Sequence, residues 1–538
     1  MSADVVMTVP PAELTEGRSR KKTRIHPWII AITITIATFM ELLDTSVANV
    51  ALPHIAGGLG TDFDASTWIL SSYLIANVIV IPLSAWFSRL FGRKNYYMGC
   101  VVVFTVSSFC CGMAPSLGWL IFFRVIQGLG GGGLAPCEQS ILADSFPPKK
   151  LGAAFAFYAM TISAAPALGP TLGGWITDNL NWRWVFFINV PVGLISLIAS
   201  YFVVSDSIRM KREMKKARET EQRIDLLGIV FIALALGCLE VVLDQGQRKD
   251  WLESNYIVFF LTVSLVSFVL ALWWELTTPN PAVDLSLMKD RNFAVACGLY
   301  FIFGFILLGT TELIPRMLQT LFGYTAIEAG WVLGPGALLI ICVTPLVVWL
   351  VRIVGVIPLL VGSFVVQGYS LWLFSQYNLA TDHSSFVHAR LIQAFGIALL
   401  LVPSAFVATS YLPKHMNNRA SSLGNLFRNL GMSFGVAFVT TVQAQRVQVH
   451  QSFLIEHLNA NESITGTRLH LYAGELQKHM TVPDTHAPAQ ALLQEVMLGQ
   501  ASMLAYLDTF WLMIGFTFVG IALVLCIKSF KLMGGLLW

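Results

Sequence analysis

Two unrelated motifs recur in this chain, and both recur at nearly the same separation. The pattern P-L-x-x-W-x-x-R-x-x-G runs from Pro82 to Gly92 and again from Pro345 to Gly355, 263 residues further on. The pattern R-x-I-Q-x-x-G runs from Arg124 to Gly130 and again from Arg390 to Gly396, 266 residues further on. Because chance would not give two motifs one common spacing, the chain is predicted to consist of two copies of an ancestral half.

Both copies lie in strongly apolar surroundings. The 538 residues are 55% hydrophobic and 12% charged, with a mean hydropathy of +0.68, whereas a soluble domain carries about 25% charged residues. A soluble fold could not bury so much apolar surface, so the chain is predicted to be an all-α membrane protein that crosses the bilayer many times. A duplicated apolar chain is typical of a secondary transporter, whose substrate path lies between two related bundles.

Fourteen apolar stretches are long enough to cross a bilayer as helices. The two motifs fall on the second and tenth stretches and on the fourth and twelfth, so equivalent helices are eight spans apart. This shift predicts two six-helix bundles with two extra helices between them. The predicted spans are 28–50, 66–88, 97–115, 118–140, 152–175, 184–204, 225–244, 255–275, 292–314, 326–350, 355–376, 386–409, 423–443 and 508–530.

Basic residues predict the orientation of these spans. Lys and Arg gather in alternate connecting segments, among them the N-terminal tail and the run from Arg209 to Arg223. Because basic loops stay on the cytoplasmic side, both termini are predicted to be cytoplasmic, and the first span is predicted to be retained. The predicted parts are a cytoplasmic N-terminal tail (1–27), a first bundle (28–204), a cytoplasmic linker (205–224), two inserted helices (225–275) and a second bundle (292–538) with a long periplasmic loop (444–507).

Ionisable side chains inside the predicted spans are few, and each costs about 3 kcal/mol to insert. Glu41 and Asp44 lie three residues apart on one face of the first span. Arg124 and Glu138 lie on the fourth span, with Arg124 about 9 Å below its outer end and Glu138 near its cytoplasmic end. Asp44 and Arg124 are therefore expected to pair in the outer half of the membrane, and these charges are expected to face the seam between the bundles.

These four residues form the predicted proton-coupling set. An acid in such surroundings titrates according to its neighbours, so Asp44, together with Glu41, is predicted to exchange a proton next to Arg124 while substrate competes with it. The same residues also fit a structural ion pair that locks two helices together, and the sequence leaves both interpretations open. Trp68 and Tyr73 at the outer start of the second span either line the pathway or anchor the helix at the interface. The predicted substrate-binding set is Glu41, Asp44, Trp68, Tyr73, Gln127 and Glu138.

The fifth predicted span carries small residues at every fourth position: Ala165, Gly169 and Gly173. Such a stripe lets another helix pack closely, while Pro170 interrupts the hydrogen-bond ladder. Helix packing alone accounts for the stripe. The functional interpretation adds that the close contact seals one side of a transport pathway.

At these residues the chain resembles the major facilitator superfamily, and within it the fourteen-span drug:proton antiporters of the EmrB/QacA type. The resemblance is carried by LDTSVANVALP (Leu43–Pro53), RVIQG (Arg124–Gly128), GPTLGG (Gly169–Gly174) and WRWVFFINVPVG (Trp182–Gly193). It implies a role in proton coupling for Arg124. The residues that match the antiporter motif are Gly169, Pro170, Gly173 and Gly174.

One segment departs from the pattern of that family. The loop between the second and third spans usually carries G-x-L-x-D-R-x-G-R, but here Ala85 replaces the first glycine and Arg89 replaces the aspartate. This departure weakens the case for a charge-relay gate at that loop. Pumps of this type in double-membraned bacteria work with a periplasmic adaptor and an outer-membrane channel, and the resemblance implies the same partners here.

The sequence therefore predicts a secondary active transporter in the inner membrane, not an enzyme. It is expected to exchange protons for hydrophobic or amphiphilic compounds by alternating access between two bundles. No cofactor or metal is predicted, because the cysteines lack ligand spacing and the glycine run at 130–133 has no phosphate-loop context. The open alternatives are export or symport of one metabolite, such as a fatty acid or a siderophore, and a receptor on a transporter-like scaffold.

Overall fold

The protein is almost entirely helical wherever its structure is described. The computed structural model describes residues 26–205, 225–278, 281–409, 416–456, 463–479 and 486–527, and these residues contain no strand. The predicted N-terminal tail and linker fall almost wholly outside these ranges. The helices are α1 (Pro27–Leu59), α2 (Phe63–Ser66), α3 (Trp68–Phe91), α4 (Arg93–Met113), α5 (Leu117–Gly131), α6 (Leu134–Ser145), α7 (Pro148–Asn179), α8 (Trp184–Phe187), α9 (Asn189–Val203), α11 (Leu226–Gln245), α12 (Asn255–Thr277), α13 (Arg291–Leu321), α14 (Ala326–Val354), α15 (Val356–Phe374), α16 (His383–Thr409), α17 (Asn417–Glu456), α18 (Ser463–His479) and α19 (His486–Leu525).

Each range predicted to cross the membrane lies mainly in helix where the structure describes it. Twelve described helices are long and apolar enough to span a bilayer, and the bent helix α7 is a thirteenth. The remaining predicted span, 423–443, lies in α17, where Asn425, Arg428 and Asn429 make the helix more polar than the others. Because α17 has 40 residues, its length suffices for a crossing. The protein is an all-α, multi-pass membrane protein, and the count of fourteen spans stays a prediction.

The first repeated motif adopts the same backbone conformation in both places. Pro82 lies within α3, and its counterpart Pro345 lies within α14. Each helix ends at the last glycine of the motif, and Gly92 and Gly355 have φ angles of 86° and 93°. A residue with a Cβ atom rarely adopts this region, so glycine is required at both turns.

The second repeated motif packs in the same way in both places. A Cβ atom added to Gly130 of α5 would lie 3.0 Å from the carbonyl oxygen of Cys100 in α4. A Cβ atom added to Gly396 of α16 would lie 3.1 Å from the carbonyl oxygen of Ser363 in α15. Each of these helix pairs thus approaches through the same motif position, as a copied unit requires.

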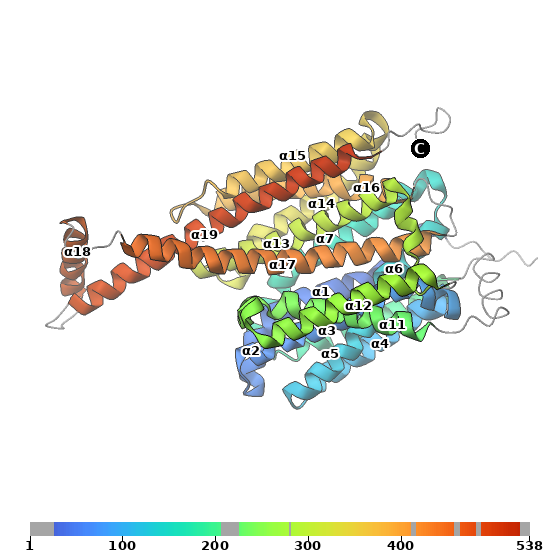
Figure 1. Ribbon diagram of the computed structural model, residues 1–538, viewed down its shortest axis with the longest axis horizontal. Coiled ribbons are helices and arrows are strands. Elements are labelled where there is room, and N and C mark those ends of the chain that lie inside the picture. The colour runs from blue at the N-terminus through green and yellow to red at the C-terminus, as the bar shows by residue number, and fades with distance from the viewer. Residues whose placement is uncertain are drawn as a thin grey trace, which may run out of the picture.

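The long helices run side by side along one direction (Figure 1). At one end, α17 and α19 extend well beyond the other helices and lead to α18. The range 444–507, expected as a loop, is therefore largely helical where it is described, because it contains the end of α17, all of α18 and the start of α19. α19 is continuous from His486 to Leu525, so it extends the last predicted span outwards.

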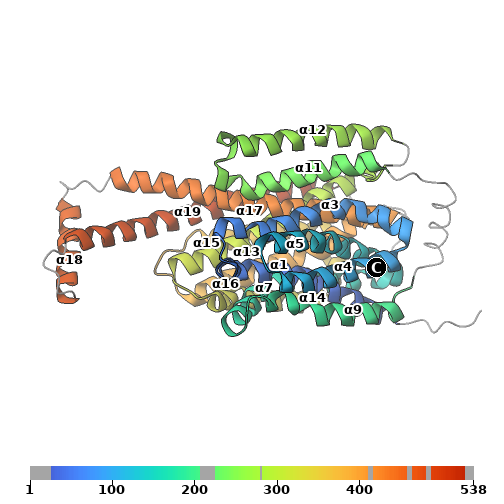
Figure 2. The ribbon, with the colours of Figure 1, turned by 90° about the horizontal axis from the view of Figure 1, so that it is seen from below.

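The two inserted helices lie on the outside of the molecule (Figure 2). α12 covers α11. Only 22% of the most apolar stretch of α12 is buried inside the protein, so most of this helix is left to face lipid. α11 contacts one helix of each bundle. Its Asp244 accepts a hydrogen bond from Ser71 of α3, and its Glu240 accepts one from Ser433 of α17 at 2.8 Å. The insertion therefore bridges the two bundles along one side.

We expect Gly396→Val to destabilise the protein more than Gly362→Val. A Cβ at position 396 would lie 3.1 Å from the Ser363 carbonyl oxygen, whereas a Cβ at position 362 meets nothing within 4 Å. Overpacking of this kind costs about 1–3 kcal/mol. Thermal unfolding of the detergent-purified variants measures the difference, and equal melting temperatures would contradict the proposed close approach of α15 and α16.

Candidate functional site

A buried arginine organises the interior of the first bundle. Arg124 of α5 donates through Nη1 to Asp44 Oδ2 of α1 at 2.6 Å and to Gln127 Oε1 at 2.8 Å. Its Nε donates to the carbonyl oxygen of Ile69 in α3 at 3.0 Å. The side chains of Arg124 and Asp44 are both 0% exposed, so this ion pair is shielded from bulk water.

The second carboxylate oxygen of Asp44 is also hydrogen-bonded. Asp44 Oδ1 accepts from Asn189 Nδ2 of α9 at 2.6 Å and from Gln127 Nε2 at 3.2 Å. Asn189 also donates to Ser108 of α4 at 3.0 Å, which fixes the orientation of its amide. A buried charge is tolerated when it is both paired and hydrogen-bonded, and Asp44 meets both conditions.

A glycine brings the helix of Arg124 close to α3. A Cβ atom added to Gly128 would lie 2.4 Å from the carbonyl oxygen of Tyr73. This approach places the guanidinium carbon of Arg124 4.6 Å from the centre of the Tyr73 ring, and Phe186 of α8 lies 5.5 Å away. Two aromatic faces therefore stabilise a cation that has lost its hydration.

Tyr73 connects the ion pair to a second acid. Its hydroxyl donates to Glu41 Oε1 at 3.2 Å, and Asn77 Nδ2 donates to the same oxygen at 3.0 Å. Although Glu41 and Asp44 are close on α1, Glu41 contacts α3 and Asp44 contacts α5 and α9. Neither donor to Glu41 is charged, so Glu41 can gain a proton without breaking an ion pair. Trp68, which begins α3, takes no part in these hydrogen bonds.

The third predicted acid lies further along α1. Glu138 of α6 is fully buried and accepts a hydrogen bond from Thr35 of α1 at 2.5 Å. Thr35 and Glu41 are about 9 Å apart along the helix axis. Three acids thus follow one helix in the order Glu138, Glu41 and Asp44.

A polar network lies where the two bundles meet. Asn429 of α17 donates to Asn77 Oδ1 at 3.4 Å, and Arg428 donates to the hydroxyl of Tyr158 in α7 at 3.0 Å. α17 therefore presents its polar face to the first bundle. Since Asn77 also contacts Glu41, this network reaches from the second bundle to an acid of the first.

This geometry corrects the expected position of the charges. Asp44 and Arg124 lie inside the first bundle among α1, α3, α5 and α9, and it is Arg428 and Asn429 that lie at the seam. Arg428 is not among the predicted site residues, although it is the charged residue of the predicted span 423–443. Asn189 is not among them either, although it lies in the stretch Trp182–Gly193 that carries the resemblance.

The glycines that match the antiporter motif pack against α1. A Cβ atom added to Gly169 would lie 2.3 Å from the Cβ atom of Ser46, and one added to Gly173 would lie 3.2 Å from the carbonyl oxygen of Val47. α7 bends by 42° across the break that contains Pro170. The motif therefore fixes α7 on the helix that carries Glu41 and Asp44.

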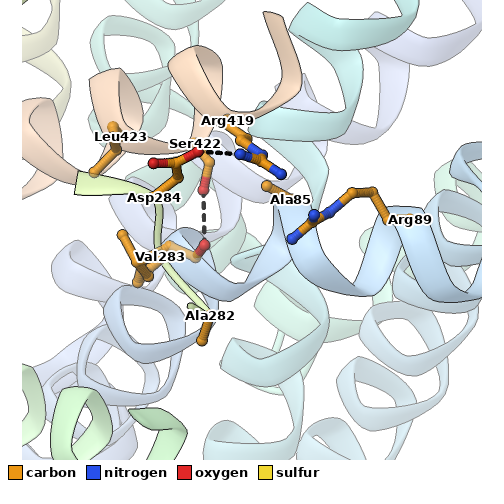
Figure 3. A pocket seen from close by; sticks show the side chains of 9 residues that line it. Ala85, Arg89, Ala282, Val283, Asp284, Arg419, Ser422 and Leu423 are labelled. Carbon is orange, nitrogen blue, oxygen red and sulfur yellow. Dashed lines mark hydrogen bonds and ion pairs between the residues drawn. The ribbon is translucent and has the colours of Figure 1, made fainter. Parts of the chain in front are cut away.

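A second contact closes the seam near the α3–α4 turn. Ser422 of α17 donates to the carbonyl oxygens of Ile81 and Pro82 in α3, at 2.6 and 3.0 Å. Beside it lies a small pocket in which Asp284, from the segment before α13, pairs with Arg419 of α17 (Figure 3). We refer to Ser422, Arg419 and Asp284 as the latch, because they join α17 to α3 and to the segment that follows the inserted helices.

The latch contains a carboxylate close to the position where the resemblance would place an aspartate. Position 89 holds an arginine, and Arg89 lines the same pocket as Asp284 (Figure 3). Burial raises the pKa of Asp284, but hydrogen bonds from Ser286 and the charge of Arg419 outweigh it and hold this pKa below its usual value. A carboxyl group whose pKa is lower in the folded than in the unfolded protein stabilises the folded state above about pH 3.9. This stabilisation is lost as the pH falls through the folded-state pKa of Asp284. The latch pair therefore stays charged at physiological pH.

Comparisons with known proteins agree with this architecture. A model of the Major Facilitator Superfamily matches residues 34–436. The "Multidrug export protein EmrB" of Haemophilus influenzae is 36% identical over 92% of this chain and 94% of that protein. The "Fatty acid resistance protein FarB" of Neisseria gonorrhoeae is 34% identical over 80% of this chain and 83% of that protein. Among solved structures, the proton:xylose symporter XylE has the same fold, with a TM-score of 0.58 at 15% identity over 92% of this chain and 95% of that one.

We expect Asp44→Asn and Arg124→Gln each to destabilise the protein by about 3–5 kcal/mol, because each leaves a buried charge unpaired. The double variant removes both charges and should be more stable than either single variant. Thermal unfolding in detergent measures all three. The control is Arg446→Gln, which breaks a pair with Asp508 whose side chains are 41% and 29% exposed and should cost less than about 1 kcal/mol. Additive losses in the double variant would show that the charges do not depend on each other.

Proposed function

This chain belongs to the major facilitator superfamily, and on that premise we propose that it is a proton-coupled multidrug efflux transporter for hydrophobic and amphiphilic compounds. The observation that carries the proposal is the buried system of acids around Arg124, placed in a duplicated helical fold. Relatives that match over most of their length are named multidrug export proteins. The protein is a secondary active transporter and not an enzyme.

The proposed arrangement places the protein in the inner membrane with both termini in the cytoplasm. Residues 28–204 and 292–538 form the two bundles, the tail 1–27 and the linker 205–224 are cytoplasmic, and residues 225–275 are inserted between the bundles. The helices that project at the other end then lie in the periplasm. This projection offers a surface to a periplasmic adaptor, which would connect the transporter to an outer-membrane channel.

The proposed proton carrier is Glu41, with Asp44 and Arg124 as the pair that positions its surroundings. Protonation of Asp44 would leave the charge of Arg124 uncompensated in an apolar interior, which is costly. Protonation of Glu41 breaks no ion pair, since its donors are Tyr73 and Asn77. Because Asn77 also contacts Asn429 of the second bundle, a change at Glu41 reaches the seam directly.

Glu138 completes the proposed route for the proton. It lies further along α1 than Glu41, on the side away from Arg124, and its donor Thr35 is neutral. Substrate competes with the proton for the space among Glu41, Tyr73 and Gln127. The antiporter motif, with Gly169 and its neighbours packed against α1, transmits changes on α1 to α7.

The energetics of this exchange are sufficient. A membrane potential of 100 mV supplies about 2.3 kcal/mol per charge, and one pH unit supplies about 1.4 kcal/mol. One proton can therefore support a substrate gradient of roughly 500-fold.

Export of one defined compound is the alternative that a specific observation favours. A relative of similar identity is named a fatty acid resistance protein. Inverted membrane vesicles with an acid interior separate the possibilities. A multidrug exporter accumulates several unrelated lipophilic compounds in the vesicle, an exporter of one compound accumulates a single one, and a symporter for uptake expels its substrate.

We expect purified protein to release protons when tetraphenylphosphonium is added, and Glu41→Gln to lose this release, because the amide cannot carry a proton. A pH-indicator dye in weakly buffered detergent solution measures it. The matched control is Glu240→Gln, which alters a buried glutamate of α11 outside the two bundles and should release protons normally. Unchanged release in Glu41→Gln would reject Glu41 as the carrier.

We expect a disulfide between the variants Ser84→Cys and Ser422→Cys to stop transport. The two hydroxyl oxygens lie 3.4 Å apart across the seam, and the bond would hold α3 against α17 so that this end cannot open. Substrate accumulation in inverted vesicles should fall by at least about tenfold on oxidation, since a locked bundle cannot alternate. Accumulation should recover on reduction, and each single variant should be unaffected by the oxidant. Full transport by the cross-linked protein would contradict opening at this end.

A further inference from the structure

The second bundle contains a counterpart of the Arg124 site. Thr310, Arg390 and Gln393 each lie 266 residues after Asp44, Arg124 and Gln127. Arg390 of α16 donates through Nη1 to Gln393 Oε1 at 2.5 Å and to the hydroxyl of Thr310 in α13 at 3.4 Å. The two Nη1 contacts of Arg124 are thus repeated, with a hydroxyl in place of the carboxylate.

The carboxylate has been lost, but the cation remains buried. Arg390 is 4% exposed, Gln393 and Thr310 are 0% exposed, and Arg390 forms no ion pair with any carboxylate among the described residues. Glu312, two residues further along α13, accepts a hydrogen bond from Asn49 of α1 at 3.3 Å. A buried guanidinium is costly without a counter-charge.

Two donors at this site are buried and make no hydrogen bond to the described part of the chain: Arg390 Nε and Gln393 Nε2. In the first bundle the equivalent atoms of Arg124 and Gln127 donate to the carbonyl oxygen of Ile69 and to Asp44 Oδ1. Buried donors without an acceptor are rare because each costs free energy. The donors therefore have the arrangement of a carboxylate site, and the part of the chain that the structure describes does not supply the acceptor.

A glycine lets α14 pack closely against Arg390. A Cβ atom added to Gly336 of α14 would lie 3.3 Å from Arg390 Cγ and 3.6 Å from its Nε. A larger residue at position 336 would therefore press on Arg390 beside its unused Nε. α14 also packs against α7 of the first bundle. The helix next to Arg390 Nε is therefore one that borders the seam between the bundles.

We propose that Arg390, Gln393 and Thr310 form a binding site for a carboxylate or another monovalent anion. The anion pairs with the charge of Arg390 and accepts hydrogen bonds from Arg390 Nε and Gln393 Nε2, and Thr310 borders it at the position where the first bundle has its carboxylate. If the anion is the acidic group of a substrate, the inference deepens the proposed function by naming amphiphilic acids as a substrate class. If it is free acetate or chloride, the site is a structural anion site. Both sources share the same chemistry, and the experiment separates them.

The test uses the purified full-length protein in a non-ionic detergent. The buffer contains sulfate as its only anion, so that none of the titrated monovalent anions is present at the start. Decanoate, decanol, acetate and chloride are titrated separately, and the melting temperature is recorded. We expect decanoate to raise the melting temperature of the unaltered protein and decanol, its neutral analogue, to raise it far less. Arg390→Gln should raise the half-saturating decanoate concentration by at least about tenfold, as loss of a charged hydrogen bond does. The control Arg316→Gln, which removes an exposed arginine of α13, should leave this concentration unchanged.

Thr310→Asp gives a second and opposite test. It restores the carboxylate of the first bundle, so it should raise the melting temperature of the protein without ligand and abolish the effect of decanoate. Thr310→Asn has similar size and no charge, and it should keep the effect. Size-exclusion chromatography shows whether Arg390→Gln folds. If it does not, the two Thr310 variants still test whether the anion binds at this site.

The outcomes separate the site, its ligand and the proposed function. Stabilisation by decanoate well beyond acetate and chloride assigns the site to substrates, and equal stabilisation by all three assigns it to free anions. A decanoate response that persists in Thr310→Asp, or equal responses to decanoate and decanol, overturns the site. Binding is measured without transport, so failure of the proposed function would appear separately as absent tetraphenylphosphonium accumulation in vesicles.

Discussion

A guanidinium that has no access to water must be neutralised and hydrogen-bonded by its neighbours, and this constraint sets the structure of the first bundle. The carboxylate that Arg124 needs comes from α1, a carbonyl oxygen comes from α3, and an aromatic ring comes from α8. Asn189 of α9 then holds the far oxygen of the carboxylate. Because each contact comes from a different helix, the ion pair fixes the relative positions of all of them. It also fixes Tyr73, whose ring lies on Arg124 while its hydroxyl contacts Glu41.

The two copies of the ancestral unit have kept their backbone geometry and changed their charges. The glycine turns at Gly92 and Gly355 are equivalent, and so are the glycine contacts of α5 and α16. In the described interior, however, the first bundle holds buried acids together with the buried cation Arg124, whereas the buried charged residues of the second bundle are the cations Arg390 and Arg428. Packing constrains a helix pair through the backbone, which tolerates few changes. A single side chain can be exchanged without moving a helix, so the electrostatics of the two halves have diverged more than their shape.

The helical fold and its duplication were predictable from sequence, because both depend on patterns that are visible along one chain. Hydropathy marks the spans, and two recurring motifs mark the copies. The pairing of Asp44 with Arg124 was also predictable, since depth in the membrane follows from position along a helix. The rotation of each helix about its own axis was not predictable, and for this reason the pair was expected at the seam and lies inside the first bundle. Contacts made by neutral residues, such as those of Asn77, Asn189 and Tyr158, depend on how helices from different parts of the chain meet. A role for Arg428 was not predictable either, because a lone arginine in a less apolar stretch forms no pattern along the chain.

The position of α11 has a mechanical consequence. Ser71 and Ser433 belong to different bundles, and both are hydrogen-bonded to this one helix. A rigid rocking of the bundles changes the distance between the two serines, whereas the two acceptors on α11 keep a fixed spacing. The inserted helices can move with only one bundle at a time. The hydrogen bond from α11 to the other bundle must therefore break during each transport cycle. In a transporter built this way, breaking such a hydrogen bond adds to the free-energy barrier of the conformational change, so the strength of these two bonds affects the turnover rate.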